Sequence, residues 1–230
     1  DTIPEPDALI KYMQYFTSPN GVNYAAITAN MDVYNRSTLW GKSQTVEFSS
    51  IVGIIKRSQT AVNNTMYAYS GANTMYRRNF LINVGGFRQD RATEDISIAW
   101  DHTFMNVVPK FAPDIVFHMN VPESFHDLYR QRTRWAQGGT EVWLTNFTKI
   151  ITHPWRFRFV IPMLVDTTLS IVWSFFFWIT SLIFVSLMTS FFLTGNYERV
   201  WHGIVMSMIF VSFQLIAGLF QVLAALILDF

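Results

Sequence analysis

Residues 167–193 read TTLSIVWSFFFWITSLIFVSLMTSFFL, a run without a single formal charge. After the short link TGNYER, a second uncharged run occupies residues 200–228. A helix needs about 20 predominantly apolar residues to cross the hydrocarbon core of a bilayer, and both runs are longer than that. The alternative is a buried helical hairpin inside a large soluble protein. The sequence therefore predicts two membrane-spanning helices, which are antiparallel because the link between them is short.

The charged residues lie almost entirely before these two runs. Of the 17 lysines and arginines, 16 lie at or before Arg158, and only Arg199 follows it. Charged residues make up 14% of the chain, well below the roughly 25% that is typical of soluble domains. Basic residues next to membrane spans stay on the cytoplasmic side. Lys149, Arg156 and Arg158 therefore place the polar part of the chain in the cytoplasm and Tyr197 outside.

The residue types exclude several kinds of chemistry. The chain has no cysteine, which excludes disulfides, thiolate metal sites and a cysteine nucleophile. The five histidines show no spacing typical of metal ligands. We therefore expect the histidines to lie on the surface or to serve in packing.

The polar part alternates between helix and strand patterns. Apolar residues at helical spacing predict helices over residues 6–15, from residue 45 and from residue 91. Buried apolar stretches predict strands from residue 24, just before the Ser70-Gly71 turn, and at residues 113–119. This alternation predicts an α/β domain with a mainly parallel sheet.

The segment Thr93-Glu94-Asp95 stands at the start of the helix predicted from residue 91. On a structural interpretation, Thr93 caps the helix and the two acids favour its dipole. On a catalytic interpretation, the backbone donors of the helix start keep a carboxylate ionised, so that it can act as a general base. The residues alone leave both interpretations open.

The segment YRQRTRWAQGG gathers three arginines and a tryptophan ahead of the first span. On a helix, Gln131, Arg134 and Trp135 share one face, and Arg132 points elsewhere. An amide, a guanidinium and an indole match a phosphorylated sugar, because arginine binds phosphate oxygens in a fork. The same residues also match an amphipathic helix that lies on anionic lipid. Both hypotheses stay open at this point.

The glycine pair Gly138-Gly139 predicts that this helix ends early, which favours a shaped site over a plain lipid anchor. Asp1 and the Ser70-Gly71 turn carry no functional signal by themselves. Asp166, just ahead of the first span, is expected at the membrane interface and not in catalysis.

Taken in this order, Thr93-Glu94-Asp95, the Gln-x-x-Arg-Trp segment at residues 131–135 and the two uncharged runs resemble the processive, membrane-embedded glycosyltransferases of family 2. That group includes cellulose, chitin and hyaluronan synthases. The stretches NRSTLWGKSQTVEFSSIVGIIKRSQ, TEDISIAW and RWAQGGTEVWL resemble, more specifically, the bacterial poly-β-1,6-N-acetylglucosamine synthases of biofilm exopolysaccharide. The resemblance covers most of the chain.

The resemblance implies a role for each matching residue. Asp95 would be the base that takes the proton from the acceptor hydroxyl, and Glu94 would support its loop. Gln131 and Arg134 would steady the diphosphate of UDP-N-acetylglucosamine, and Trp135 would form the floor under the acceptor sugar. The remaining implied residues are Ser70 and Gly71 at an acceptor-side turn and Asp1 as the second aspartate of Asp-x-Asp, a ligand of Mg²⁺ or Mn²⁺.

The resemblance also implies an organisation. We expect the C-terminal part of a cytoplasmic, glycosyltransferase A-type (Rossmann-like) domain at residues 1–121 and interfacial amphipathic helices at 122–160. Two transmembrane helices, at about 167–193 and 200–228, would fill residues 161–230. The expected partners are a UDP-sugar, a growing polysaccharide, membrane lipid and an accessory membrane subunit, in a multi-pass protein of the cell membrane.

Other functions compete with this one. A hyaluronan-, chitin- or cellulose-type synthase would use the same mechanism with another sugar or linkage. A non-catalytic membrane scaffold or a dolichyl-phosphate sugar transferase is disfavoured by the Gln-x-x-Arg-Trp segment. The first aspartate of Asp-x-Asp, the nucleotide-binding strands before it and the later spans have no counterpart in this sequence. We therefore expect this stretch alone to be inactive.

Overall fold

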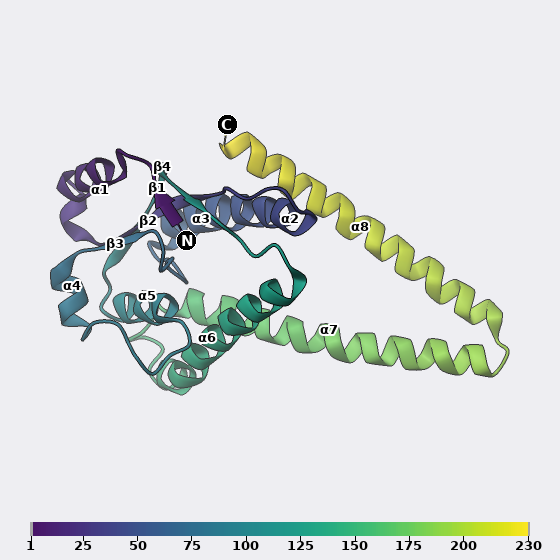
Figure 1. Cartoon of the computed structure of the whole chain (residues 1–230). Coiled ribbons are helices and arrows are strands. Elements are labelled where there is room, and N and C mark those ends of the chain that lie inside the picture. The colour runs from purple at the N-terminus through teal and green to yellow at the C-terminus, as the bar shows by residue number, and fades with distance from the viewer. Residues whose placement is uncertain (1, 230) are drawn as a thin grey trace.

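The computed structural model describes residues 2–229, apart from the side chains at 49–51, 221–222, 225–226 and 228–229. It has two parts (Figure 1). Strands and helices up to about residue 160 form an α/β part, and two long helices extend away from it as a hairpin.

A mixed sheet of four strands lies at the centre of the α/β part. The strands are β1 (Thr2–Pro4), β2 (Tyr24–Val33), β3 (Thr74–Tyr76) and β4 (Val108–Met119), in the order β1-β4-β2-β3. Only β2 and β4 run parallel, and both edge strands are antiparallel to their neighbours. The prediction of a mainly parallel sheet was therefore wrong, because β1 and β3 are three-residue strands whose direction leaves no mark on the sequence pattern.

The helices of the α/β part alternate with these strands, as the sequence predicted. Their bounds are α1 (Ala8–Thr17), η1 (Gly21–Asn23), α2 (Leu39–Phe48), η2 (Ser49–Ile55), α3 (Lys56–Asn63), α4 (Arg78–Asn83), α5 (Glu94–Phe104) and α6 (Phe125–Thr152). The strand expected before the Ser70-Gly71 turn is absent, and β3 follows the turn instead. Met66 and Tyr69 are buried there but belong to no strand.

The sheet is covered on both faces, which explains the continuous buried run from Ala25 to Ala29 in β2. Ile27 and Ala29 face Tyr12 and Phe16 of α1. Side chains of the opposite parity face the other way, because successive residues of a strand point to opposite faces. Ala26 and Phe111 lie on that second face and join the sheet to α2, η2 and α5 through a cluster with Phe48, Val52 and Ile98.

The hairpin consists of α7 (Ile161–Leu193) and α8 (Tyr197–Asp229). Ile161–Leu193 and Tyr197–Phe220 are long and apolar enough to cross a membrane. The most apolar 18 residues of each are not buried by the rest of the described chain. The two helices approach closely at Gly203, where an added Cβ would lie 2.6 Å from the sulfur of Met188. The far end of α8 returns to η2 (Figure 1). The start of α7 packs against α5 and α6 through Trp100, Val142, Ile150, Val160, Met163 and Leu164.

Candidate active site

The helix predicted after the glycine pair starts at Glu94, with extended Thr93 at the N-cap position. The Thr93 side chain makes no capping hydrogen bond, so the capping interpretation is wrong for this residue. Asp95 accepts instead from two backbone amides. The Gly71 N–H donates to Oδ2 at 3.0 Å, and the Ile96 N–H donates to Oδ1 at 2.9 Å.

The Ser70-Gly71 turn and the Glu94-Asp95 pair therefore lie together, although 23 residues separate Gly71 from Glu94. A Cβ on Gly71 would lie 3.1 Å from Oε1 of Glu94 and 3.8 Å from Oδ2 of Asp95. A residue larger than glycine would press on the Glu94 carboxylate and contact that of Asp95. Ser70 is buried at this turn, and its N–H donates to Oγ1 of Thr74 at 3.1 Å.

The environment of Asp95 acts on its pKa in both directions. Burial raises the pKa most strongly, the Gly71 amide lowers it, and the neighbouring Glu94 raises it further. Lys56 supplies the nearby positive charge, which lowers it. A carboxyl group whose pKa is raised is a stronger base once it is ionised, as general base catalysis requires.

Lys56 is the residue near this carboxylate that sequence reasoning missed. It is buried, with 8% of its surface exposed, and burial lowers its pKa to about 8 against the opposing charge of Asp95. A signal was present in the sequence. Phe48, Val52 and Lys56 recur every fourth residue and share the buried side of the α2–η2–α3 run.

A buried aromatic group lies behind this turn. Tyr69 Oη lies 3.1 Å from Nδ1 of His102, and burial lowers the pKa of His102 to about 4. This histidine is therefore neutral at physiological pH and fully enclosed, which confirms a packing role for it.

The helix that carries the Gln-x-x-Arg-Trp segment is α6, which starts at Phe125 with Ser124 as its cap. The Asp127 N–H donates to Ser124 Oγ at 3.2 Å. The prediction of an early end at Gly138-Gly139 was wrong, because α6 continues to Thr152. Gly138 is instead a packing glycine, since a Cβ there would lie 1.8 Å from Oγ1 of Thr93.

Three side chains of this segment differ in their exposure and in their contacts. Arg134 is exposed, and its Nη1 donates to the carbonyl of Ala92 at 3.4 Å. Trp135 is half-buried against the core and meets Phe48 edge to face at 6.3 Å. Gln131 is half-buried, and its Oε1 has no hydrogen-bond partner within residues 2–229.

The sequence suggested that Arg132 points away from Gln131, Arg134 and Trp135. In the structure it contacts Trp135 instead. Its guanidinium lies 4.4 Å from the ring centre of Trp135, and it pairs with Glu47 of α2 at 2.7 Å. Positions three apart on a helix are neighbours, which explains the contact. Arg132 therefore braces Trp135 and covers one side of its ring.

The described residues do not form a metal centre. Residues 2–229 contain no group of three or more histidines, aspartates or glutamates that could hold an ion. Asp1, the expected metal ligand, lies outside the described residues. Thr2, which follows it, pairs with Met119 at the end of β4, and Met119 also pairs with Val33 at the end of β2.

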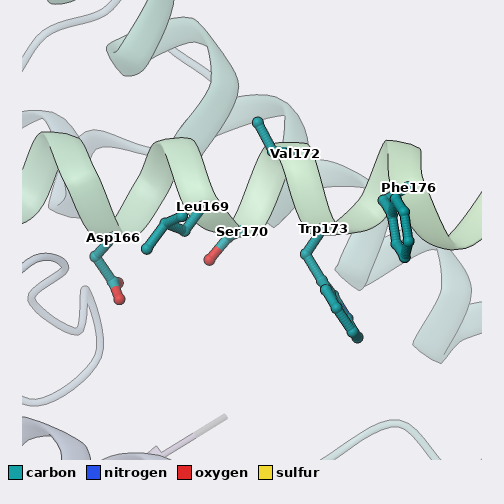
Figure 2. A pocket seen from close by; sticks show the side chains of 6 residues that line it. All are labelled: Asp166, Leu169, Ser170, Val172, Trp173 and Phe176. Carbon is teal, nitrogen blue, oxygen red and sulfur yellow. The ribbon is translucent and has the colours of Figure 1, made fainter.

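A groove of about 570 Å³ lies away from these residues, along one side of α7 (Figure 2). Asp166, Ser170 and Trp173 point to the same side of the helix there, as expected for positions four and three apart. Burial raises the pKa of Tyr67, and the charge of Asp166 raises it further. The groove contains no residue of the Asp95 site.

Together these features define an α/β protein with a candidate group-transfer site and a hairpin of two candidate membrane spans. The family described as "Glycosyl transferase family group 2" matches residues 1–228, and the chain belongs to that family. The predicted family and the predicted fold class are thus confirmed.

Named relatives narrow the comparison. A poly-beta-1,6-N-acetyl-D-glucosamine synthase of Staphylococcus aureus (strain COL) is 35% identical over 173 residues, which cover 75% of this chain and 41% of the relative. The protein of the same name from Staphylococcus epidermidis is 36% identical over 151 residues, which cover 66% of this chain and 36% of that protein. The chain therefore spans about two fifths of the length of these relatives.

A solved structure also matches. The mannosyltransferase PcManGT from Pyrobaculum calidifontis, in complex with GDP-Man and Mn²⁺, has a TM-score of 0.43 and 17% identity. The match covers 72% of this chain and 47% of that protein.

Proposed function

We propose that the full-length protein is a membrane-embedded, processive, inverting glycosyltransferase. It polymerises N-acetylglucosamine from UDP-N-acetylglucosamine into poly-β-1,6-N-acetylglucosamine. The observation that carries the proposal is the site itself: Asp95 is held by the Gly71 and Ile96 amides, and Arg134 of α6 contacts the Ala92 carbonyl just before α5. The choice of sugar is supported by the 35% identity to synthases of that name.

In the proposed reaction, the oxygen of the acceptor hydroxyl bonds to the anomeric carbon of the donor while Asp95 removes the proton of that hydroxyl. The bond from that carbon to the diphosphate oxygen breaks, and its electron pair leaves with UDP. Attack from the opposite side inverts the anomeric centre. The two amides that orient Asp95 leave its Oδ2 and Oδ1 fixed before substrate arrives, which favours catalysis by positioning.

The residues of α6 act on the diphosphate and the acceptor. Arg134 is exposed and holds the Ala92 carbonyl only at 3.4 Å, so its fork of donors is free to bind phosphate oxygens. Gln131 contributes its amide to the same group. Trp135 supports the acceptor sugar with the part of its ring that Arg132 and Phe48 leave uncovered.

We further propose a divalent cation, Mg²⁺ or Mn²⁺, with Asp1 as one of its ligands. Ions of this kind are bound through one or two carboxylates together with substrate phosphates, so a complete protein cluster is not required. When bound, the cation would offset the negative charge of the diphosphate.

The two long helices anchor the enzyme in the cell membrane, and the polymer leaves through the membrane-embedded part of the whole protein. Sixteen basic residues precede α7, and those nearest to it support a cytoplasmic α/β part. We also propose an accessory membrane subunit as a partner, and only the resemblance to family 2 synthases supports it.

This orientation predicts the labelling of two exposed positions. The 230 residues contain no cysteine of their own. In the full-length protein, Tyr197→Cys is expected to react with a membrane-impermeant thiol reagent in intact cells, and Gln89→Cys only after the cells are permeabilised. Both positions are exposed, so the membrane alone separates them. Labelling of Gln89→Cys but not Tyr197→Cys in intact cells would reverse the orientation.

The identity of the donor is tested by UDP release. Membranes that hold the full-length protein are mixed separately with UDP-N-acetylglucosamine, UDP-glucose and UDP-glucuronic acid, each with Mg²⁺ or Mn²⁺. We expect release above background with UDP-N-acetylglucosamine alone. Release with UDP-glucose would support a cellulose-type synthase. Release that requires UDP-N-acetylglucosamine and UDP-glucuronic acid together would support a hyaluronan-type synthase, and release with none of them would support the scaffold.

A further inference from the structure

Helix α6 contacts the residues just before α5 at three points along one side. Arg134 donates to the carbonyl of Ala92, Gly138 lies against Thr93, and Glu141 accepts from the amide of Ala92 at 3.1 Å. Positions 134, 138 and 141 are four and three residues apart, so they share a face of the helix. Residues 92–93 are thus held from one helix, two positions before Asp95.

The contact at Gly138 has no spare room. An added Cβ would lie 1.8 Å from Oγ1 of Thr93 and 2.7 Å from its Cβ. Thr93 is buried, with 3% of its surface exposed, and its branched side chain has few rotamers to retreat into. The neighbouring Gly139 has nothing within 4 Å of an added Cβ. A side chain therefore fits at Gly139 but not at Gly138.

The contact at Glu141 is a charge-assisted hydrogen bond. One carboxylate oxygen accepts from the Ala92 amide, and the other accepts from Nε2 of Gln137 at 2.7 Å. The bond from Ala92 lowers the pKa of Glu141 most, and the bond from Gln137 lowers it further. The group is therefore ionised at neutral pH. Hydrogen bonds to a carboxylate are stronger than those between neutral groups.

We infer that Gly138 and Glu141 are positioning residues for Asp95, because they fix the backbone at 92–93 to the helix that carries Arg134. The inference rests on the proposed function. Arg134 would give up the Ala92 carbonyl when its guanidinium binds the diphosphate, and Gly138 and Glu141 would then hold the segment. The base and the donor-binding arginine thereby keep one relative placement through the reaction, where a shift of about 1 Å can cost on the order of 10²-fold.

The glycine pair supplies a matched test in the full-length enzyme. We expect Gly138→Ala to lower kcat for polymer synthesis by roughly 10²-fold, with the KM for UDP-N-acetylglucosamine changed by less than about threefold. Gly139→Ala should retain wild-type kcat. Both changes place alanine in the same helix, so helix propensity is the same for both. Equal kcat values for the two variants would overturn the inference for Gly138.

A second pair of variants decides the matter if Gly138→Ala fails to fold, as shown by aggregation after extraction in detergent. Glu141→Ala removes the acceptor for the Ala92 amide, whereas Glu141→Gln keeps an oxygen there. We expect Glu141→Ala to lower kcat with KM unchanged. Glu141→Gln should retain most of the wild-type kcat. Equal losses in both, or a loss confined to KM, would overturn the inference. A wild-type enzyme that transfers no sugar would instead refute the proposed function.

Discussion

Asp95→Asn in the full-length protein is expected to abolish polymer synthesis while UDP affinity stays within about threefold of wild type. General base catalysis contributes on the order of 10²–10⁴-fold, so the loss should be plain. Asparagine has nearly the same shape and can still accept from one of the two amides that hold Asp95. The change therefore removes the base more than it disturbs the turn. Polymer is measured by incorporation of labelled sugar, and UDP affinity by competition with a labelled nucleotide.

Asp90→Asn is the matched control for that change. Asp90 lies five positions earlier, is exposed, and pairs at the surface with Arg88 at 3.1 Å, a contact that contributes little to stability. Synthesis by this variant should equal that of wild type. Near wild-type synthesis by Asp95→Asn would refute its role as the base and leave the Glu94-Asp95 pair with an effect on the helix dipole alone.

Arg134→Lys is expected to reduce polymer synthesis severely, by at least about tenfold. Lysine keeps the charge but loses the planar fork of donors that binds two phosphate oxygens at once. A helix that only lies on anionic lipid predicts a different pattern, because each basic residue near the surface then contributes about 1 kcal/mol and arginine and lysine are interchangeable. Trp135→Ala should also reduce polymer synthesis severely, since the acceptor sugar loses its support.

The control is Arg130→Lys, a second exposed arginine on the same helix, one turn earlier. We expect wild-type synthesis from it, and wild-type fractionation with membranes from every variant, because α7 and α8 are unchanged. Arg132→Lys is not neutral in this structure. It should give a partial loss, since Arg132 braces Trp135 at 4.4 Å and pairs with Glu47. Equal, mild effects of the changes at 130 and 134 would favour the lipid anchor.

Much of the architecture could be predicted from local patterns. The start of α5 follows from acids in its first turn, and the extent of α7 and α8 follows from two long uncharged runs. These features are set within one element, by the helix dipole and by hydrophobic length. The Thr93-Glu94-Asp95 and Gln-x-x-Arg-Trp segments could likewise be found, because together they resemble the motifs of family 2 glycosyltransferases.

The rest depends on contacts between distant segments, which one sequence does not display. Gly138 was predicted to end a helix, yet α6 continues through it, and the missing side chain leaves room for Thr93. Arg132 was predicted to point away, yet Glu47 and Trp135 hold it. In the same way, the burial of Lys56 near Asp95 arises only when η2 packs against the sheet.

The most direct test is the chemical structure of the product. Membranes that contain the full-length protein are incubated with labelled UDP-N-acetylglucosamine and Mg²⁺, and the high-molecular-weight material is analysed for linkage by methylation. We predict labelled polymer composed of 6-linked N-acetylglucosamine, absent from membranes that carry Asp95→Asn. Polymer of 4-linked N-acetylglucosamine, label that stays in single-sugar products, or equal polymer from the Asp95→Asn membranes would contradict the proposed function.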